Sequence, residues 1–153
     1  MQALELKVPP LVVGMIVGGL MWLTKRAVPV LGFTFPGRRP FAIILAIAGA
    51  AIIVMGFASF RRAKTTVNPM KPDSASSLVV SGIYDLTRNP MYLGFLVILV
   101  GWAFFLSNAL GFIFLPLFVL YMNRFQIEPE ERALASLFGE AFASYRSRVR
   151  RWL

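Results

Sequence analysis

The sequence predicts an all-α fold, an integral membrane bundle of about four transmembrane helices with a C-terminal amphipathic helix on the cytoplasmic side. Composition is the first observation: 58% of the 153 residues are hydrophobic and 15% are charged, whereas soluble domains have about 45–50% apolar residues. The second observation is a series of four apolar runs. The third is the uneven distribution of Lys and Arg between the segments that connect these runs.

The runs long enough to be membrane spans are 8–24, 41–60, 91–106 and 110–125. A transmembrane helix needs roughly 20 residues, with a range of about 17–25, so the second run fits and the others are short or borderline. Ser107 and Asn108 separate the last two runs, which together are too long for one crossing, and we expect a tight helical hairpin there. A signal peptide is the alternative for the first run, but Glu5 offsets Lys7 and no small-residue cleavage site follows.

The basic residues predict that both termini are cytoplasmic. With four spans, one side of the membrane receives all of the 16 Lys and Arg residues except Lys25, Arg26, Arg38 and Arg39. Lys and Arg are enriched in short cytoplasmic segments, so the richer side is the cytoplasm. All seven acidic residues lie on that side as well, and chemistry that needs a carboxylate must therefore occur there.

The net charge of +9 indicates attraction to anionic lipid headgroups rather than to nucleic acid, because the basic residues flank apolar runs. The chain has no Cys and no His. This excludes disulfides, thiolate metal ligands, a cysteine nucleophile and a histidine base. We therefore predict membrane lipids as partners, and neither a nucleic-acid partner nor a metal site.

Two cytoplasmic segments are candidates for function. Segment 61–90 is rich in turn formers and too long for a simple connection. Segment 128–153 carries apolar residues at helical spacings of three and four, which predicts one or two amphipathic helices, with Gly139 as the expected break. In the first span, Gly14 and Gly18 have the small-xxx-small spacing of closely packed helices, which also permits a homodimer.

The first motif is RNPMYLG at 88–94, where segment 61–90 enters the third span. Pro90 suits the first turn of a helix, and the free N–H groups of a helix N-terminus can bind an anion such as a cofactor carboxylate. Gly94 permits close approach of a ligand or of another helix. On local physics alone, an ordinary helix start is the simpler interpretation, with Asn89 as cap and Tyr92 at the interface.

The second motif is EPEER at 128–132. Pro129 can open a helix, which places Glu130 and Glu131 in a first turn where the helix dipole favours carboxylates. The same groups suit the ribose hydroxyls, the ammonium or the sulfonium of a cationic cofactor. Arg124, at the cytoplasmic end of the fourth span, can clamp a substrate anion. Helix capping and a positive-inside anchor are the simpler interpretations.

From residue 65 to the end, the chain resembles the isoprenylcysteine carboxyl methyltransferase and phospholipid methyltransferase families. The resemblance rests on the order and spacing of TTVNP at 65–69, SGIY at 81–84, RNPMYLG at 88–94, GWA at 101–103, Glu130-Glu131, Leu134, Phe138-Gly139, Tyr145 and Val149.

The resemblance implies a prokaryotic-type membrane enzyme that transfers methyl groups from S-adenosylmethionine to a lipophilic carboxylate or amine. It assigns cofactor binding to Arg88, Asn89, Pro90, Met91, Tyr92, Gly94, Glu130 and Glu131. Gly101 in the third span is a further cofactor-binding candidate, as the floor of the pocket, although helix packing is the simpler interpretation. It makes Arg124, Tyr92 and Glu131 the expected catalytic residues. Asn89 stands where carboxyl methyltransferases often have histidine and looks like the phospholipid branch, so the acceptor and the choice between O- and N-methylation stay open.

We expect one membrane domain over 1–153, with two spans in 1–60 and with the cofactor-binding loop, the helical hairpin and the C-terminal helix in 61–153. An NADPH-dependent sterol-type reductase, a small four-helix transporter and a structural membrane protein are the alternatives. The glutamate pair and the proline–x–tyrosine order favour methyl transfer over reduction. No acidic residue lies inside an apolar run, which argues against a proton-coupled transporter.

Overall fold

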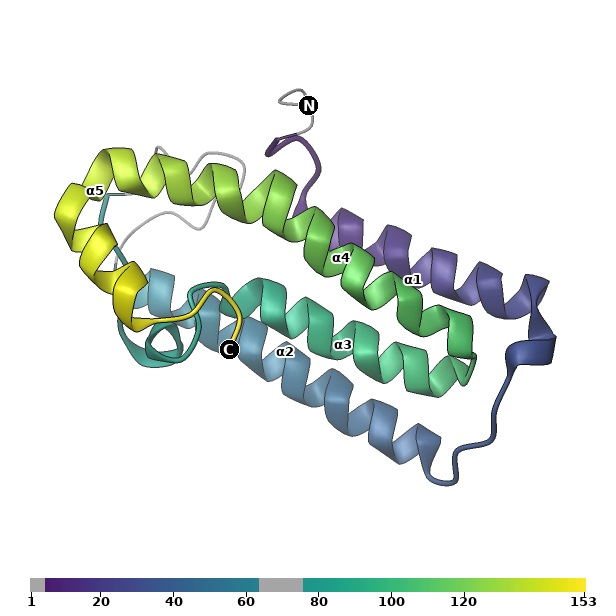
Figure 1. Ribbon diagram of the computed structural model, residues 1–153. Helices are drawn as coiled ribbons and strands as arrows, with labels where there is room; N and C mark the ends of the chain where they lie inside the picture. The colour runs from purple at the N-terminus through teal and green to yellow at the C-terminus, as the bar shows by residue number, and fades with distance from the viewer. Residues whose placement is uncertain (1–4, 64–75) are drawn as a thin grey trace.

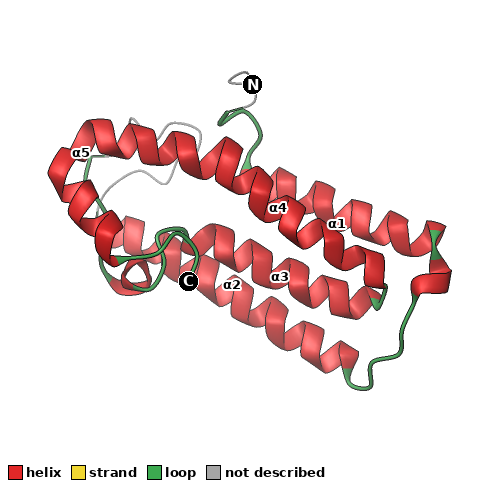
Figure 2. Ribbon diagram, viewed as in Figure 1, coloured by secondary structure: helices red, strands yellow, loops and turns green. Residues whose placement is uncertain are grey.

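The computed structural model describes residues 5–63 and 76–153. Its α-helices are α1 (Pro10–Ala27), α2 (Arg38–Arg62), α3 (Pro90–Leu106), α4 (Phe114–Met122) and α5 (Glu128–Arg148). The π-helix Asn123–Ile127 joins α4 to α5, and 3₁₀ helices lie at Pro29–Leu31, Gly82–Asp85 and Ala109–Ile113. Figures 1 and 2 show α1 to α4 as a bundle with α5 extending beyond one end. The described residues form no strand beyond one isolated bridge, and the all-α prediction is confirmed.

Glycines hold α2 and α3 in close contact. A Cβ atom on Gly49 would lie 2.6 Å from the carbonyl oxygen of Gly94, and one on Gly94 would lie 2.5 Å from Cγ1 of Ile53. Two turns further along α3, a Cβ atom on Gly101 would lie 3.1 Å from the carbonyl oxygen of Ala42. Only residues without side chains let the two backbones approach this closely.

On its other side, α3 packs against α1. Gly18 lies opposite Leu99 and Trp102, and the indole N–H of Trp102 donates to the carbonyl oxygen of Gly18 at 3.0 Å. The close packing predicted for the first-span glycines therefore occurs within the chain. Gly19 faces open space, and the homodimer stays a prediction. The buried apolar residues around this contact include Val13, Val17, Met21, Leu99, Phe118 and Met122.

The predicted hairpin between the third and fourth apolar runs is confirmed. Ser107 adopts a left-handed φ of 50°, and its N–H donates to the carbonyl oxygen of Ala103 at 2.9 Å. The Asn108 side chain accepts from the Leu110 N–H at 3.1 Å and donates to the carbonyl oxygen of Val28 at 2.8 Å. Asn108 thus fixes the turn and ties it to the end of α1.

The fourth apolar run continues into the C-terminal helix without a loop. In the π-helix, the N–H of Glu128 bonds to the carbonyl oxygen of Asn123, five residues back. Gly139, at φ 49° and ψ −121°, breaks α5, as the sequence predicts. The chain after this break turns back toward the start of α3 (Figure 1).

The second half of α5 is held by its own apolar cluster. Tyr84 and Tyr145 are both buried, and the Tyr145 hydroxyl donates to the carbonyl oxygen of Tyr84 at 2.8 Å. Phe60 meets the Tyr84 ring edge-on, with the centroids 5.4 Å apart. This cluster fixes the C-terminal residues beside the start of α3.

Within residues 5–63 and 76–153, two helical stretches are long and apolar enough to cross a membrane, α2 and Ala109–Arg148, and the apolar helix α3 is shorter. Ile43, Ile47 and Val54 of α2 are 59–66% exposed. Such an apolar surface needs an apolar environment outside the chain. These are the features of a helical membrane protein, and the number of four spans stays a prediction.

We expect Gly49→Ala to lower the free energy of unfolding by about 1–3 kcal/mol, as overpacking of a tight core does. The added methyl group would meet the carbonyl oxygen of Gly94. Gly19→Ala is the matched control, because nothing lies within 4 Å of a Cβ atom there. Denaturant unfolding in detergent measures both variants, and equal losses would contradict the close approach of α2 and α3.

Candidate functional site

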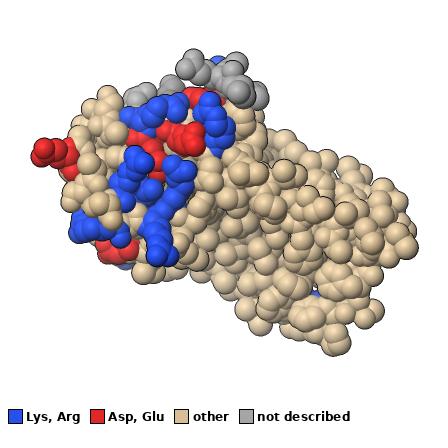
Figure 3. Space-filling model, in the orientation of Figure 1, with Lys and Arg blue, Asp and Glu red and all other residues tan. Residues whose placement is uncertain are grey.

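Charged side chains gather at one end of the molecule, whereas most of the remaining visible face lacks them (Figure 3). At this charged end α3 and α5 begin, and the C-terminal residues pass beside them (Figure 1). The two motifs singled out in the sequence therefore meet at one place.

The closest link between the two motifs joins Tyr92 to Glu130. Tyr92 lies in the first turn of α3, which begins with Pro90, and is 4% exposed. Its hydroxyl donates a short hydrogen bond to Oε1 of Glu130, in the first turn of α5. The helix starts, 38 residues apart in the chain, are thereby held together.

The surroundings of Glu130 favour its protonated form. Burial of the carboxyl group raises its pKa from 4.5 to about 8, although the hydrogen bond from Tyr92 lowers the pKa. The nearby charge of Glu131 adds to the increase. A cation placed against Glu130 would favour the ionised form, so binding of such a cation would be coupled to release of a proton.

Glu131 is held by two arginines. Arg151 approaches it in parallel, with Nη2 2.7 Å from Oε2 and Nε 3.2 Å from Oε1. Arg88 contributes Nη2 at 3.1 Å from Oε1. The side chains of Arg88 and Glu131 are only 10% and 12% exposed. Arg88 therefore brings a buried positive charge to the site, with a pKa lowered by burial and raised by Glu131.

Arg88 keeps two donors free. Its Nε and Nη1 are buried and have no hydrogen-bond partner among the described residues. A buried donor without a partner carries a desolvation cost of roughly 1–3 kcal/mol. An acceptor brought by a ligand, such as a carboxylate oxygen, would remove this cost.

The C-terminal residues after α5 lie along the first motif. The side chain of Asn89 donates to the carbonyl oxygen of Arg151 at 2.8 Å, and the N–H of Arg88 donates to that of Arg150 at 3.0 Å. Trp152 donates to the side-chain oxygen of Asn123 at 3.0 Å. Asn89 is therefore partly committed to holding this tail.

Arg124 lies beside acidic residues from two segments. Its Nη1 is 2.9 Å from Oε1 of Glu5 and 3.4 Å from Oε2 of Glu128. Arg132 also contacts the Glu5 carboxylate. The anion-binding capacity predicted for Arg124 is thus engaged by carboxylates of the chain itself.

The remaining predicted residues face α2. Pro90 and Met91 lie against Gly56, while Gly94 and Gly101 form the α2–α3 contact described above. These positions give the four residues a packing role, and their cofactor contacts stay predictions. The resembling piece TTVNP at 65–69 lies outside the described residues.

Sequence reasoning missed several residues of this site. The sequence indicates Arg151 only as one of the basic residues on the predicted cytoplasmic side, Glu5 only as an offset to Lys7, and Trp152 only as an apolar residue within segment 128–153. Their contacts join segments 20 to 119 residues apart. Local pattern carries no signal for such pairs, although the basic run at the end of the chain marks a place where carboxylate partners are expected.

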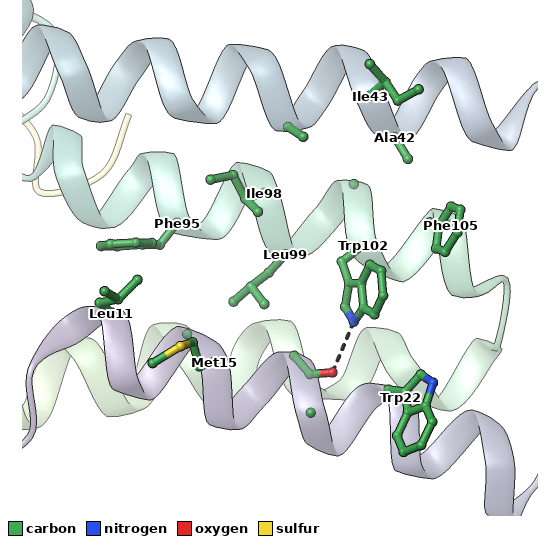
Figure 4. A pocket seen from close by; sticks show the side chains of 15 residues that line it. Leu11, Met15, Trp22, Ala42, Ile43, Phe95, Ile98, Leu99, Trp102 and Phe105 are labelled. Carbon is green, nitrogen blue, oxygen red and sulfur yellow. Dashed lines mark hydrogen bonds between the residues drawn. The ribbon is translucent and has the colours of Figure 1, made fainter.

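The described residues contain no cluster of acidic, His or Cys side chains suited to a metal. A recess of about 320 Å³ lies beside the Glu131 contacts, lined by Glu128, Glu131, Arg132, Ala135, Arg146 and Arg151. A larger apolar groove of about 630 Å³ runs between α1 and α2 along α3. Figure 4 shows Leu11, Phe95 and Trp102 along this groove.

The raised pKa of Glu130 predicts a pH-dependent stability. Folded Glu130 keeps its proton up to about pH 8, whereas an unfolded glutamate loses it near 4.5. The folded state thus binds more protons in between, and its free energy of unfolding should fall as the pH rises from 4.5 to about 8.

Unfolding in detergent at several pH values tests this. Glu130→Gln should flatten that part of the profile, whereas Glu140→Gln, at an exposed position of the same helix, should not. Identical profiles for the Glu130→Gln variant and the unchanged protein would show that Glu130 is not held in its protonated form.

Comparison with known proteins links this geometry to a family. The model of the family described as phospholipid methyltransferase matches residues 38–141. Protein-S-isoprenylcysteine O-methyltransferase B of Arabidopsis thaliana is 27% identical over 121 residues, which cover 75% of this chain and 61% of that protein. The protein-S-isoprenylcysteine O-methyltransferase of Schizosaccharomyces pombe is 37% identical over 75 residues, covering 47% and 30%. No solved structure matches.

An uncharacterized protein of Haemophilus influenzae is 44% identical over 63 residues, which are 41% of this chain and all of that protein. The chain spans only 61% and 30% of the two methyltransferases above. The family match nevertheless extends over more than half of the chain, and it includes both the RNPMYLG segment and the Glu130–Glu131 pair. The chain therefore belongs to the phospholipid methyltransferase family.

Proposed function

We propose that this protein is an S-adenosylmethionine-dependent methyltransferase that acts on a lipophilic carboxylate or amine at the cytoplasmic face of the membrane. The observation that carries the proposal is the contact between Tyr92 and Glu130. It joins the two segments that the family resemblance assigns to the cofactor. Family membership supports methyl transfer, since the family is described as phospholipid methyltransferase and two of the three relatives named above are methyltransferases by name.

The polar groups at this end of the bundle fit S-adenosylmethionine. The two free donors of Arg88 suit its carboxylate, because a buried guanidinium binds carboxylates strongly. The carboxyl group of Glu130, which accepts from Tyr92, suits its ammonium group or ribose hydroxyls. The Arg88–Glu131–Arg151 contacts would hold Arg88 in place, which makes Glu131 a positioning residue.

When bound, S-adenosylmethionine supplies a methyl group on a sulfonium sulfur, which an acceptor oxygen or nitrogen can take by in-line displacement. Such a step needs alignment and exclusion of water more than a strong base. Arg124 would orient an anionic acceptor through charge-assisted hydrogen bonds. A carboxylate acceptor needs no deprotonation, whereas the proton of an amine acceptor could pass to the ionised carboxylate of Glu130.

We further propose that the four spans are α1, α2, α3 and the stretch 110–125, which contains α4, and that the charged end faces the cytoplasm. Lys and Arg concentrate at this end, as the positive-inside rule requires. The apolar groove along α3 reaches Phe95, one turn from Tyr92. It supplies apolar surface on which a lipid chain from the bilayer could lie while its head group reaches the charged end.

Titration calorimetry of the purified protein with S-adenosylmethionine tests the cofactor assignment. Glu130→Gln should weaken binding by about 10- to 100-fold, the equivalent of one hydrogen bond to a charged group. Tyr92→Phe should weaken it by about tenfold, because Glu130 would lose its hydrogen-bond donor.

Two matched variants serve as controls. Glu140→Gln removes the same charge from an exposed position, and Tyr121→Phe removes the same hydroxyl from a ring that packs on Phe125. Both should bind S-adenosylmethionine like the unchanged protein. The assignment fails if the Glu130 and Tyr92 variants bind as tightly as these controls, or if the folded protein binds no cofactor at millimolar concentration.

A further inference from the structure

The N-terminal segment 5–9, called the strap below, is fastened to the π-helix before α5. The N–H of Leu6 donates to the carbonyl oxygen of Phe125 at 3.0 Å. Pro129, four residues after Phe125, has no N–H to offer that oxygen, and Leu6 takes its place. The side chain of Gln126, fully buried, donates to the carbonyl oxygen of Val8 at 2.6 Å.

At its first residue the strap places a carboxylate between two guanidinium groups. Oε1 of Glu5 lies 2.9 Å from Nη1 of Arg124, and Oε2 contacts Nη2 of Arg132. The Glu5 side chain is only 13% exposed, whereas those of Arg124 and Arg132 are 39% and 58% exposed. The carboxylate is thus covered by the arginines, while the arginines themselves remain open to a ligand.

The strap is held under strain. Leu6 has a φ of 55°, a left-handed conformation that a residue with a branched side chain rarely adopts. The hydrogen bond from the Leu6 N–H to Phe125 therefore fixes a backbone conformation that is unfavourable for leucine.

We propose that Glu5 is an internal stand-in for the anionic group of the methyl acceptor and competes with it for Arg124 and Arg132. This inference rests on the function proposed above and narrows its substrate class. The acceptor would carry an anionic oxygen group at or beside the methylated atom. A carboxylate that is itself methylated meets this condition, and so does the phosphate beside the amine of an aminophospholipid.

The geometry explains how an anionic group of the acceptor can replace the Glu5 carboxylate between Arg124 and Arg132. Two guanidinium groups that each contact one oxygen of Glu5 match any group with two anionic oxygens. Glu128, at 3.4 Å from Arg124, stays in place when Glu5 leaves and keeps the arginine oriented. A neutral acceptor would gain nothing from displacement of Glu5.

The test compares Glu5→Gln with the unchanged full chain in detergent, by thermophoresis with three probes and without cofactor. The probes are N-acetyl-S-farnesylcysteine, its uncharged methyl ester, and a short-chain phosphatidylethanolamine. Glu5→Gln should bind at least one of the two probes that carry an anionic oxygen group, the farnesylcysteine or the phospholipid, about 3- to 10-fold more tightly, since the internal competitor has lost its charge. The affinity of Glu5→Gln for the uncharged methyl ester should equal that of the unchanged protein.

The carboxylate of the farnesylcysteine and the phosphate of the zwitterionic phospholipid distinguish the sources of the anionic group. Tighter binding of the farnesylcysteine alone assigns the site to a carboxylate, and tighter binding of the phospholipid alone assigns it to a phosphate. Glu140→Gln, which removes a charge from an exposed position of α5, should change none of the three. Glu5→Ala is the second variant. It removes the carboxylate without leaving a side chain that can form hydrogen bonds, and it should behave like Glu5→Gln.

The proposal would be overturned if both Glu5 variants bound the farnesylcysteine and the phospholipid no more tightly than the unchanged protein does. It would also be overturned if they bound the uncharged ester more tightly by the same factor. This outcome is distinct from failure of the proposed function. Binding of S-adenosylmethionine, measured separately by calorimetry, does not depend on whether Glu5 competes with the acceptor.

Discussion

The contact between Tyr92 and Glu130 is the constraint on which the rest of the site depends. It fixes the start of α5 against the start of α3, although the two helices are separated by a hairpin that reaches the opposite end of the bundle. Beside it, Glu131 draws Arg88 and Arg151 together. Partly buried ion pairs of this kind contribute little net stability, but removal of one partner is costly. The main effect of these contacts is positional. They place the free Nε and Nη1 of Arg88 and the carboxyl group of Glu130 at the same end of the bundle.

The bundle beneath the site is built to make this placement rigid. Glycines bring α2 and α3 into backbone contact, and the hydrogen bond from Trp102 ties α3 to α1. The π-helix then continues α4 into α5 without an intervening loop. Gly139 turns the chain back, so that residues 149–153 return to the RNPMYLG segment. Each of these features fixes the position of the backbone. The few side chains of the site are therefore held in place although the protein is small.

Much of this arrangement could be predicted from the sequence. The lengths of the apolar runs predict helices, the Ser107–Asn108 break predicts the hairpin, and Gly139 predicts an interruption of the last helix. The structure confirms these three features. The pairing of the RNPMYLG segment with the glutamates followed from family resemblance rather than from local physics. Contacts made by Glu5 and by the tail after α5 could not be predicted, because they join distant segments and partly use backbone oxygens, which every residue possesses. Nor could the packing role of Gly94 be separated from a ligand role, because both need an absent side chain.

The central claim is that the start of α3 and the start of α5 form one cofactor pocket. Ultraviolet crosslinking of S-adenosylmethionine, labelled in the methyl group, to the folded protein in detergent tests it most directly. Peptide mapping should find the label in both 88–94 and 128–132, and excess unlabelled cofactor should abolish it. Label confined to peptides from the opposite end of the bundle, around 25–39 or 107–113, would contradict the claim.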